Sequence, residues 1–426
     1  MNDRVAQLVV FSDDWGRHPS SCQHLVARLL PRYSTVWVNT IGTRMPGLSG
    51  DDLRKVAAKL RQWSRRRPGA GAATPSGDMP ANLTVVSPRM FPGFRRSWQR
   101  RLNASAMRKA VHEALGPRRD GVDRIAITTL PLTADLVGSL EVDRWVYYCV
   151  DDFSAWPGLD SGVMQAMEAQ QAGKVDRVIA VSDVLCDRLT GMGAKPSLLT
   201  HGIDLAHWRS PEFAQTAKAG QPSLSPSASA TQPLPDWCAA AKRPIFLFWG
   251  LLDRRLDAAW CAALVEANPG TLVLLGPRQE LDPPLVELLE KDDGRVIAPG
   301  PAGYDQLPAL AAWADVLVMP YADLPVTRAM QPLKFKEYLA AGWPKHGKPV
   351  VVRALPATAD WADAADGVDT ADTFAAMVKE RLATGLPDSQ RQARQRLEEE
   401  TWDRKAMEFE SLIMLTTRSG NTDEHG

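Results

Sequence analysis

The stretch QPLKFKEYLAAGWPKHGKPVVV, residues 331–352, reads as a helix followed by a buried strand. In its first part, apolar residues and a glycine recur at the three- and four-residue spacing of one helix face, namely Phe335, Tyr338, Leu339 and Gly342. The run KPVVV at its end is continuous and β-branched, which is typical of a parallel strand that helices cover on both faces. The stretch therefore predicts the helix-to-strand half of an α/β unit.

The same alternation runs through the whole chain. Two series of short apolar runs, separated by segments of helical period, predict two sets of strands. The first set is 7–12, 34–40, 124–130, 144–150, 177–182 and 197–202, and the second is 244–250, 271–276, 295–300, 315–321 and 348–354. We expect an α/β protein with two doubly wound, Rossmann-like domains that face each other across a cleft.

The domain boundaries follow from length and composition. At 426 residues the chain suits two domains. The segment AKAGQPSLSPSASATQPLPDW is rich in Ala, Ser, Pro and Gln, a composition typical of a flexible linker. We therefore expect a first domain over 1–208, a linker with a low-complexity insertion over 209–243, and a second domain over 244–400.

Charge and cysteine content limit the class of protein. The formal net charge is zero, but 14 basic residues and one acid lie between Arg54 and Lys109, which favours an anionic partner or simple solvation. The five cysteines are scattered and form no CxxC pair, so we expect no disulfide framework, no metal site and a reducing cytoplasm. We expect neither a signal peptide nor a membrane span.

The start of the helix in residues 331–352 is a candidate binding site. Ligands of open parallel sheets lie beyond the carboxyl ends of the strands, and Arg328, Lys334 and Glu337 follow strand 315–321 at that edge. A cation near free helix amides is unfavourable unless an anion such as phosphate joins it, and a carboxylate one turn on can accept hydrogen bonds from ribose. A plain Lys–Glu pair on the helix surface is the other interpretation.

Two carboxylates, Asp151 and Asp152, directly follow strand 144–150 at the same kind of edge in the first domain. Neighbouring carboxylates repel each other, and partial burial can raise one pKa enough for proton transfer. Both are therefore candidate catalytic groups, with Asp151 first. The alternative is that they cap the following turn.

The first domain holds further polar candidates. His201 and Gly202 follow its last strand at the hinge, where His201 either hydrogen-bonds a sugar or packs, and Gly202 permits close approach to a ligand. His18, Ser20 and Ser21 precede its first helix, where they either receive an acceptor or diphosphate or only cap the helix.

Five segments, in order along the chain, resemble bacterial glycosyltransferases with the GT-B fold, in particular the glycogen-synthase-like (family 4 type) enzymes of surface-polysaccharide synthesis. From the C-terminal end, they are TRAMQPLKFKEYLAAG with KPVVV, GLLDRRLD (250–257), DRVIAVSDVLCDRLTGMGAKPSLLTHGIDLAHW (176–208), VYYCVDDFSAWPG (146–158) and WGRHPSSCQHLVARL near the start. The resemblance covers nearly the whole chain.

This resemblance implies roles for residues of the second domain. Glu337 would hold the ribose of a nucleoside diphosphate sugar. In the loop that begins at Gly250, Arg254 or Arg255 would act with Lys334 to neutralise the diphosphate leaving group without a metal.

Two further positions modify that picture. Arg328 would be an additional cation at the diphosphate. Many family members carry a glutamate eight residues before the ribose-binding one, near the donor sugar, and here that position is Ala329. The usual sugar contact is therefore missing.

The implied function is transfer of a sugar from a nucleoside diphosphate sugar, used as co-substrate with no cofactor, to a hydroxyl acceptor. That acceptor would be a lipid-linked or growing surface polysaccharide. The family implies retention of anomeric configuration, an implication that Ala329 weakens. A nucleotide-sugar epimerase of the same fold, or an inactive nucleotide-sugar-binding partner in a polysaccharide complex, are the alternatives.

The basic segment RMFPGFRRSWQRRLNASAMRK, residues 89–109, interleaves aromatic and arginine side chains. Such a mixture suits an anionic membrane surface, and predicts a peripheral position on the cytoplasmic side of a membrane. A solvated basic helix with aromatic residues in the core is the alternative. Nucleic acid is not expected, because no recognised binding module accompanies the charge.

Two connecting segments complete the comparison with the family. In the resembling enzymes the AAG helix end runs directly into KPVV, so WPKHG (343–347) is an insertion here, which we expect to be a surface extension and a contact for a partner. Gly342 can end the helix in a left-handed turn. The last helix, 401–418, would cross back to the first domain, as in GT-B enzymes.

Overall fold

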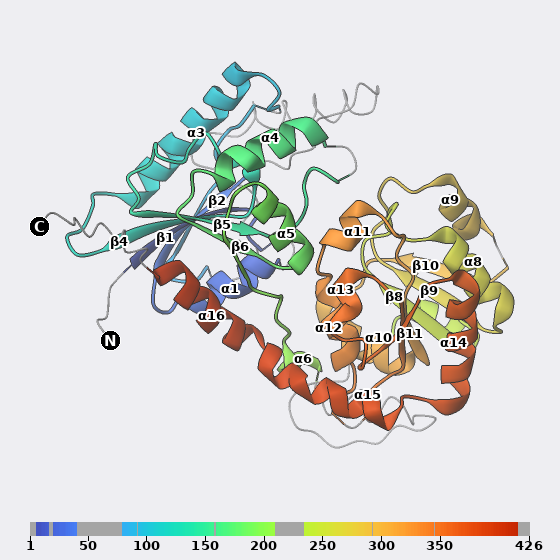
Figure 1. The fold of residues 1–426 in the computed structure, drawn as a ribbon. Helices are drawn as coiled ribbons and strands as arrows, with labels where there is room; N and C mark the ends of the chain where they lie inside the picture. The colour runs from blue at the N-terminus through green and yellow to red at the C-terminus, as the bar shows by residue number, and fades with distance from the viewer. Residues whose placement is uncertain are drawn as a thin grey trace, which may run out of the picture. The chain divides into compact units, whose positions relative to one another are not determined.

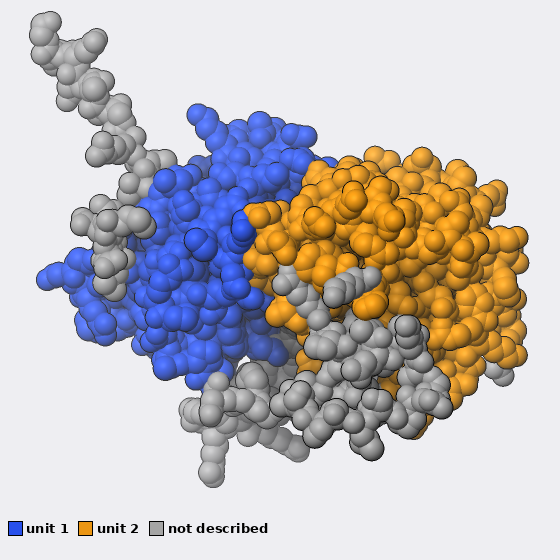
Figure 2. Space-filling view, turned by 90° about the horizontal axis from the view of Figure 1, so that it is seen from below, with its two compact units in different colours: residues 1–200, 403–426 blue, residues 201–402 orange. Residues whose placement is uncertain are grey.

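The chain divides into two compact units, coloured separately in Figure 2. Unit 1 comprises residues 1–200 and 403–426, and unit 2 comprises residues 201–402. The computed structural model describes residues 6–16, 20–40, 79–91, 93–156, 159–208, 234–291, 293–344 and 346–415. His18, most of the expected linker and Lys345 of the WPKHG segment lie outside these ranges.

Unit 1 is built on a parallel sheet. Its described part has seven strands in the order β3-β2-β1-β4-β5-β6-β7. They are β1 (Ala6–Ser12), β2 (Ser34–Asn39), β3 (Leu83–Val86), β4 (Asp123–Thr128), β5 (Arg144–Cys149), β6 (Arg177–Ala180) and β7 (Pro196–Leu198). The central strands are almost wholly buried, as continuous apolar runs of this kind predict.

Helices cover both faces of this sheet (Figure 1). The described helices are α1 (Ser21–Leu29), α3 (Ser97–Leu115), η1 (Pro131–Thr133), α4 (Ser161–Ala172), α5 (Asp183–Gly191) and, beyond its first residue, α16 (Trp402–Met414). α3 and α4 pack on one face, where Met107 and Met167 join the core residues of β1, β2 and β4. On the other face α16 lies beside α1, since Asp403 pairs with Arg28 at 2.7 Å.

Unit 2 repeats this plan around a second parallel sheet. Its six described strands run in the order β10-β9-β8-β11-β12-β13. They are β8 (Ile245–Trp249), β9 (Thr271–Leu275), β10 (Val296–Gly300), β11 (Val316–Met319), β12 (Val350–Arg353) and β13 (Asp366–Val368). The helices are α6 (Leu205–Trp208), η2 (Asp236–Ala240), α8 (Ala258–Ala267), α9 (Pro283–Glu290), η3 (Tyr304–Gln306), α10 (Leu307–Trp313), α11 (Pro325–Ala329), α12 (Leu333–Ala340), α13 (Pro356–Ala359), α14 (Ala371–Thr384), α15 (Asp388–Ala393) and η4 (Arg394–Glu400).

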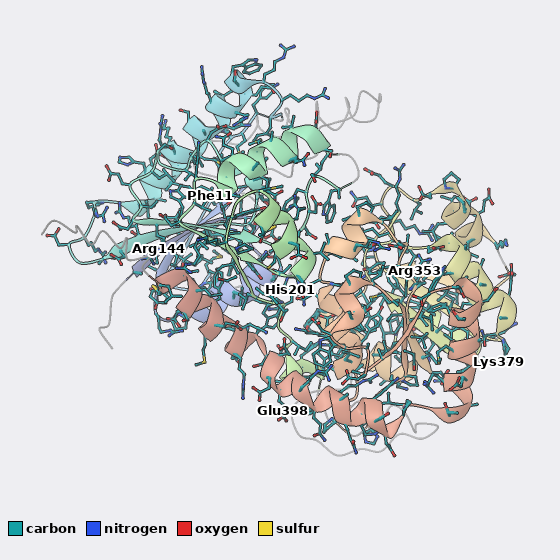
Figure 3. The ribbon with its side chains drawn as sticks, in the orientation of Figure 1. Phe11, Arg144, His201, Arg353, Lys379 and Glu398 are labelled. Carbon is teal, nitrogen blue, oxygen red and sulfur yellow. The ribbon has the colours of Figure 1, made fainter. Side chains whose placement is uncertain are left out.

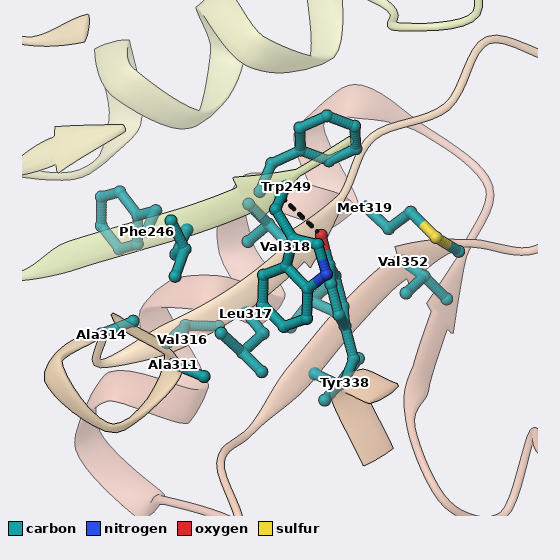
Figure 4. Close-up of a cluster of buried hydrophobic side chains, with 14 of the residues drawn as sticks. Phe246, Trp249, Ala311, Ala314, Val316, Leu317, Val318, Met319, Tyr338 and Val352 are labelled. Carbon is teal, nitrogen blue, oxygen red and sulfur yellow. Dashed lines mark hydrogen bonds between the residues drawn. The ribbon is translucent and has the colours of Figure 1, made fainter. Parts of the chain in front are cut away.

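The core of unit 2 joins α12 to the central strands (Figure 4). Tyr338 is fully buried, and its hydroxyl accepts a hydrogen bond of 3.0 Å from the backbone N–H of Trp249. Because this bond lies at the carboxyl end of β8, it holds the helix at the edge of the sheet where ligands of such folds bind.

Each sheet has one point at which the strand order reverses. In unit 1 it lies between β1 and β4, and in unit 2 between β8 and β11. The next elements leave in opposite directions at such a point, which opens a crevice beyond the carboxyl ends of the two strands. In unit 2, Gly250 and Tyr321 therefore mark the expected ligand position.

Each of the eleven strands expected from the sequence overlaps an observed strand. The largest difference is at 197–202, where β7 ends at Leu198. β3 and β13 were not expected. Both pair as parallel edge strands, and their residues are only partly buried. An edge strand needs no continuous apolar run, so its sequence signal is weak.

Two local expectations need correction. Residues 201–208 belong to unit 2 because Ile203 pairs with Thr401 and Trp208 is fully buried in the unit 2 core. The WPKHG segment is not wholly a surface extension, since Trp343 is also buried in that core. Gly342 does adopt the left-handed conformation, with φ of 77°.

Within the described residues, no helix combines the length and apolar character that crossing a membrane requires.

Candidate functional site

The residue directly after β8, Gly250, lies against the side chain of Lys334. Gly250 has φ of 145°, and a Cβ atom added to it would stand 1.8 Å from Lys334 Nζ. No other residue type could occupy this position without displacing the lysine. The first turn of α12 therefore places its cation directly over the end of β8, at the switch point of unit 2.

Aromatic rings flank the Lys334 ammonium. Its Nζ lies 4.4 Å from the ring centroid of Phe248 and 4.9 Å from that of Tyr321. Such rings attract a cation but replace little of the water that it loses. Burial, together with the positive charge of Arg255, lowers the pKa of Lys334 from 10.5 to about 7, against the weaker opposing influence of Asp253. An anion at this point would restore the charged form.

Glu337 is one turn further along α12 and is held by two donors. Trp249 Nε1 donates to its Oε2 at 3.1 Å, and the side chain of Tyr304 also hydrogen-bonds to it. Burial raises the pKa of Glu337, while these donors and Lys334 act in the opposite sense. The carboxylate is thus oriented before any ligand arrives.

An aromatic group fixes the two donors in turn. The Trp249 ring lies 4.0 Å from that of Tyr338 and stacks on Trp208 at 5.7 Å. The ring of Tyr304 stacks on His207 at 4.2 Å. Because each ring packs on another, the hydrogen bonds to Glu337 have defined geometry.

Main-chain bonds hold the loop of residues 250–257 against the loop after β11. Asp257 N–H donates to the carbonyl of Pro320 at 2.9 Å, and Ala322 N–H donates to that of Arg255 at 2.7 Å. Arg353, labelled in Figure 3, reinforces the frame by donating to Asp257 at 2.9 Å and to the Tyr321 carbonyl at 2.8 Å. The crevice wall at Gly250 is therefore rigidly built.

The three arginines expected near a diphosphate differ in their surroundings. Arg255 is largely buried and pairs with Asp253 at 2.9 Å, and its charge still acts on Lys334. Arg254 is half exposed and pairs with Asp282 at 3.1 Å. Arg328 is exposed and pairs with Asp323 at 2.5 Å. All three arginines therefore pair with a carboxylate, and Arg255 is the one whose charge acts on Lys334.

Arg328 and Ala329 belong to the short helix α11. Arg328 lines a cavity of about 430 Å³ with apolar residues that follow β12, among them Leu355 and Trp361. Ala329 is only 3% exposed. A glutamate, which many members of the resembling family have there, would therefore stand at a buried position.

In unit 1, the two carboxylates after β5 have different surroundings. Asp152 is buried and accepts hydrogen bonds from Ser154 N–H at 3.0 Å and from Ser154 Oγ at 2.6 Å. Arg188 also lies 3.6 Å from it. These contacts match the capping interpretation for Asp152. Asp151 is half-buried and stands two residues after Cys149, the last residue of β5.

The loop after β1 contains a carboxylate that the sequence did not single out. Asp13 accepts hydrogen bonds from the hydroxyls of Ser12 and Ser20, at 2.8 and 2.9 Å, and from Gln23 Nε2 at 2.8 Å. Ser20 also caps α1, and Ser21 is buried. The sequence could have indicated Asp13 as a candidate, because it directly follows β1, a strand at the switch point.

His201 and Gly202 are tied into unit 2. The backbone N–H of His201 donates to the Gln331 side chain, and its carbonyl accepts from Lys336 Nζ. A Cβ at Gly202 would lie 2.7 Å from the Trp402 ring. The close approach that this glycine permits is therefore to Trp402. A ligand role for either residue stays a prediction.

Among the described residues, no group of three or more His, Cys, Asp or Glu side chains is arranged to hold a metal ion.

Comparison by sequence finds no matching family model and no matching curated protein. Solved structures do match over nearly the whole chain. Sucrose-phosphate synthase from Thermosynechococcus elongatus has a TM-score of 0.65 at 16% identity, over 96% of this chain and 98% of its own. The E. coli structure titled "Trehalose-6-phosphate" and bound with UDP-2-fluoro glucose gives 0.64 at 13%, over 96% and 100%.

A third match is HepE of Anabaena in complex with UDP-glucose, with a TM-score of 0.56 at 13% identity, over 95% of this chain and 94% of its own. These structures share the GT-B architecture, and both parallel sheets of the chain are included in the match. The chain has the GT-B fold. The fold expected from residues 331–352 and the four other segments is therefore confirmed. At these identities the likeness concerns the GT-B fold alone.

Proposed function

We propose that the protein is a glycosyltransferase that moves a sugar from a nucleoside diphosphate sugar to a hydroxyl acceptor. The observation that carries this proposal is the arrangement of Gly250, Lys334 and Glu337 at the switch point of unit 2. It combines a partly buried cation, whose charge the neighbouring groups do not fully balance, with a pre-oriented carboxylate one turn away. A diphosphate joined to a ribose satisfies both groups.

A bound diphosphate would explain why a lysine, Lys334, stands at this position. Burial and Arg255 both disfavour its charged form in the free protein, and an anion placed beside the ammonium would stabilise that form. The free amides at the start of α12 favour the same anion. In the proposed reaction, the bond between the anomeric carbon and the diphosphate oxygen breaks, and Lys334 with Arg255 stabilises the departing charge.

A bound ribose would explain why a carboxylate, Glu337, stands one turn further along α12. Its carboxylate already accepts hydrogen bonds from Trp249 and Tyr304, and it retains acceptor capacity for two neighbouring hydroxyls. We assign the acceptor step to unit 1. There Asp151 receives the proton of the acceptor hydroxyl as its oxygen bonds to the anomeric carbon. Retention of configuration is the proposed outcome, which requires the acceptor oxygen to approach the anomeric carbon on the same face that the diphosphate leaves. The donor sugar finds no glutamate at Ala329.

Uridine diphosphate is the first donor nucleotide to test, because the fold-related structures above are complexes with UDP-2-fluoro glucose and UDP-glucose. For the acceptor, we propose a lipid-linked or growing surface polysaccharide. This part rests on the resemblance of the five sequence segments.

The decisive experiment is calorimetric titration of UDP into the full-length chain. Glu337→Ala removes the ribose contact, and Lys334→Ala removes the phosphate contact, so each variant should weaken binding by at least about tenfold. Lys379→Ala, at an exposed position on α14, is the matched control and should bind UDP as the wild type does. Unchanged UDP binding in Glu337→Ala would remove the assignment.

Product analysis separates the alternatives. An epimerase would convert the UDP-sugar in the absence of any acceptor, and a binding-only partner would bind it without turnover under any acceptor. The proposed transferase releases UDP and forms a new glycoside only when an acceptor with a free hydroxyl is present.

A further inference from the structure

Helix α3 of unit 1 has two contrasting faces. Its buried face consists of Asn103, Met107 and Val111, spaced four residues apart. On the opposite face stand two large apolar side chains, Trp98 and Leu102, which are 48% and 51% exposed. Residues four apart lie one above the other on a helix, so these two form one apolar patch.

The exposed tryptophan is held in place. Its ring packs edge-on against Phe91, with centroids 5.0 Å apart. The loop that carries Phe91 is fastened to α3 by Asn103, whose side chain accepts from the Phe91 N–H at 2.6 Å and donates to its carbonyl at 3.0 Å. A buried amide with these bonds fixes the loop, so Trp98 presents its ring in one defined position.

Cations surround this apolar patch. The segment 95–109 contains six basic residues and no acid: Arg95, Arg96, Arg100, Arg101, Arg108 and Lys109. Two of them are engaged within unit 1, Arg95 by Asp160 at 2.5 Å and Arg100 by Asp135 at 2.6 Å.

Three further cations of the helix are free of such pairs. They are exposed and form no salt bridge to any residue in the described part of the chain, and they are Arg96, Arg101 and Arg108. Arg101 and Arg108 are seven residues apart and therefore line one side of the patch.

We infer that this surface, defined by Trp98, Leu102, Arg96, Arg101 and Arg108, binds the headgroup region of an anionic lipid bilayer. Tryptophan rings favour the boundary between headgroups and acyl chains, and a short aliphatic side chain beside one adds apolar area. Unpaired arginines attract anionic headgroups over the same area. This inference does not depend on the proposed activity, because every residue in it belongs to unit 1 and lies outside the proposed donor site.

The apolar pair also favours lipid over nucleic acid. A nucleic-acid surface needs cations that follow the phosphate backbone and rings available for stacking on bases. Leu102 neither contacts phosphate nor stacks on a base, and the Trp98 ring already packs against Phe91. An acidic protein is the remaining partner, and the experiment distinguishes it.

The test is co-sedimentation of the full-length chain with phosphatidylcholine vesicles that contain or lack phosphatidylglycerol. We expect binding only to the anionic vesicles, and weaker binding as salt rises. The double variant Arg101→Glu with Arg108→Glu should lose at least about tenfold in partition, and so should Trp98→Ala with Leu102→Ala.

Matched controls keep the result interpretable. Met407→Ala removes a side chain that is 67% exposed on α16, also in unit 1, and should bind vesicles as the wild type does. The double variant Lys195→Glu with Lys379→Glu makes the same change in net charge at exposed positions elsewhere and should keep most of the binding. Thermal melting checks that each variant is folded, and UDP titration reports on unit 2 separately.

Three results would overturn the inference. The first is equal binding to neutral and anionic vesicles. The second is anionic binding that survives both α3 double variants. The third is absence of vesicle binding while the chain binds single-stranded RNA or an acidic polypeptide through the same arginines.

Discussion

At the scale of single residues, the donor site depends on a glycine and a lysine that share one space. The lysine occupies the volume that a Cβ on Gly250 would need, and two aromatic rings flank its ammonium. The local sequence placed Lys334 at a helix start. The role of Gly250 in making room for it appears only when the loop and the helix are seen together.

The variant Gly250→Ala tests this shared space. The new methyl group would displace Lys334 Nζ, which lies 1.8 Å from its position, so UDP affinity should fall by at least about tenfold. The control is Gly385→Ala, since Gly385 also has a positive φ, of 73°, but has no atom near its Cβ position. That variant should lose about 1 kcal/mol of stability and keep its UDP affinity. Equal affinity in both variants would contradict the model of the site.

The pKa of Lys334 predicts how UDP binding depends on pH. In the free protein the lysine loses its proton near pH 7, and bound diphosphate raises that pKa. UDP affinity should therefore fall as pH rises from about 7 to 9, with proton uptake on binding, because the terminal phosphate of UDP is already ionised there. Calorimetry in two buffers of different ionisation enthalpy measures this uptake, which Lys334→Ala should abolish.

The same shift affects the stability of the ligand-free protein. Because the unfolded chain keeps this proton up to its ordinary pKa of 10.5, the unfolded state binds more protons than the folded state above pH 7. The contribution of Lys334 to the free energy of unfolding therefore rises with pH across that interval. Lys334→Met should flatten this part of the stability profile.

At the scale of elements, the sequence predicts the central strands of both sheets and misses one edge strand of each, β3 and β13. Strands such as β8 and β9 are buried on both faces, so their sequences are continuous apolar runs. β3 and β13 are short and partly exposed, and each contacts the sheet on one side only. Their sequences carry no run that separates them from loops.

The segment between β7 and α6 gives a prediction at this scale. Gly202 packs so closely on Trp402 that a Cβ would lie 2.7 Å from the indole ring and 2.9 Å from the Trp402 Cα. Gly202→Ala should destabilise unit 2 by about 1–3 kcal/mol in urea denaturation. Gly367→Ala, whose Cβ would meet Ala354 at an ordinary 3.6 Å, is the control and should change stability little. Loss of UDP binding without loss of stability in Gly202→Ala would instead support a ligand role for this glycine.

At the scale of the whole molecule, the chain contains two Rossmann-like units, each with one switch point. This duplication is the reason to divide the proposed reaction into a donor part and an acceptor part. The donor part rests on unit 2, and the acceptor part rests on Asp151 in unit 1.

Asp151→Asn tests that division. If Asp151 accepts the proton of the acceptor hydroxyl, the variant should lower kcat by at least about a hundredfold and leave UDP affinity unchanged. Asp152→Asn is the comparison, since its carboxylate accepts two hydrogen bonds from Ser154 and serves the turn. The main effect of that variant should be a lower melting temperature, with only a small change in kcat. A fall in UDP affinity in Asp151→Asn would contradict the division.

The sequence by itself determined the α/β class, the two sets of central strands and the helix start that carries Lys334 and Glu337. These features are local, because the pattern of apolar residues within a short segment predicts which strands are buried and which helix face is apolar. The tertiary structure decided the rest. It brought Trp249 and Tyr304 to Glu337, Asp253 to Arg255 and Trp402 to Gly202. All but the Asp253 contact join residues distant in the chain, and their side-chain contacts depend on packing that no local pattern records.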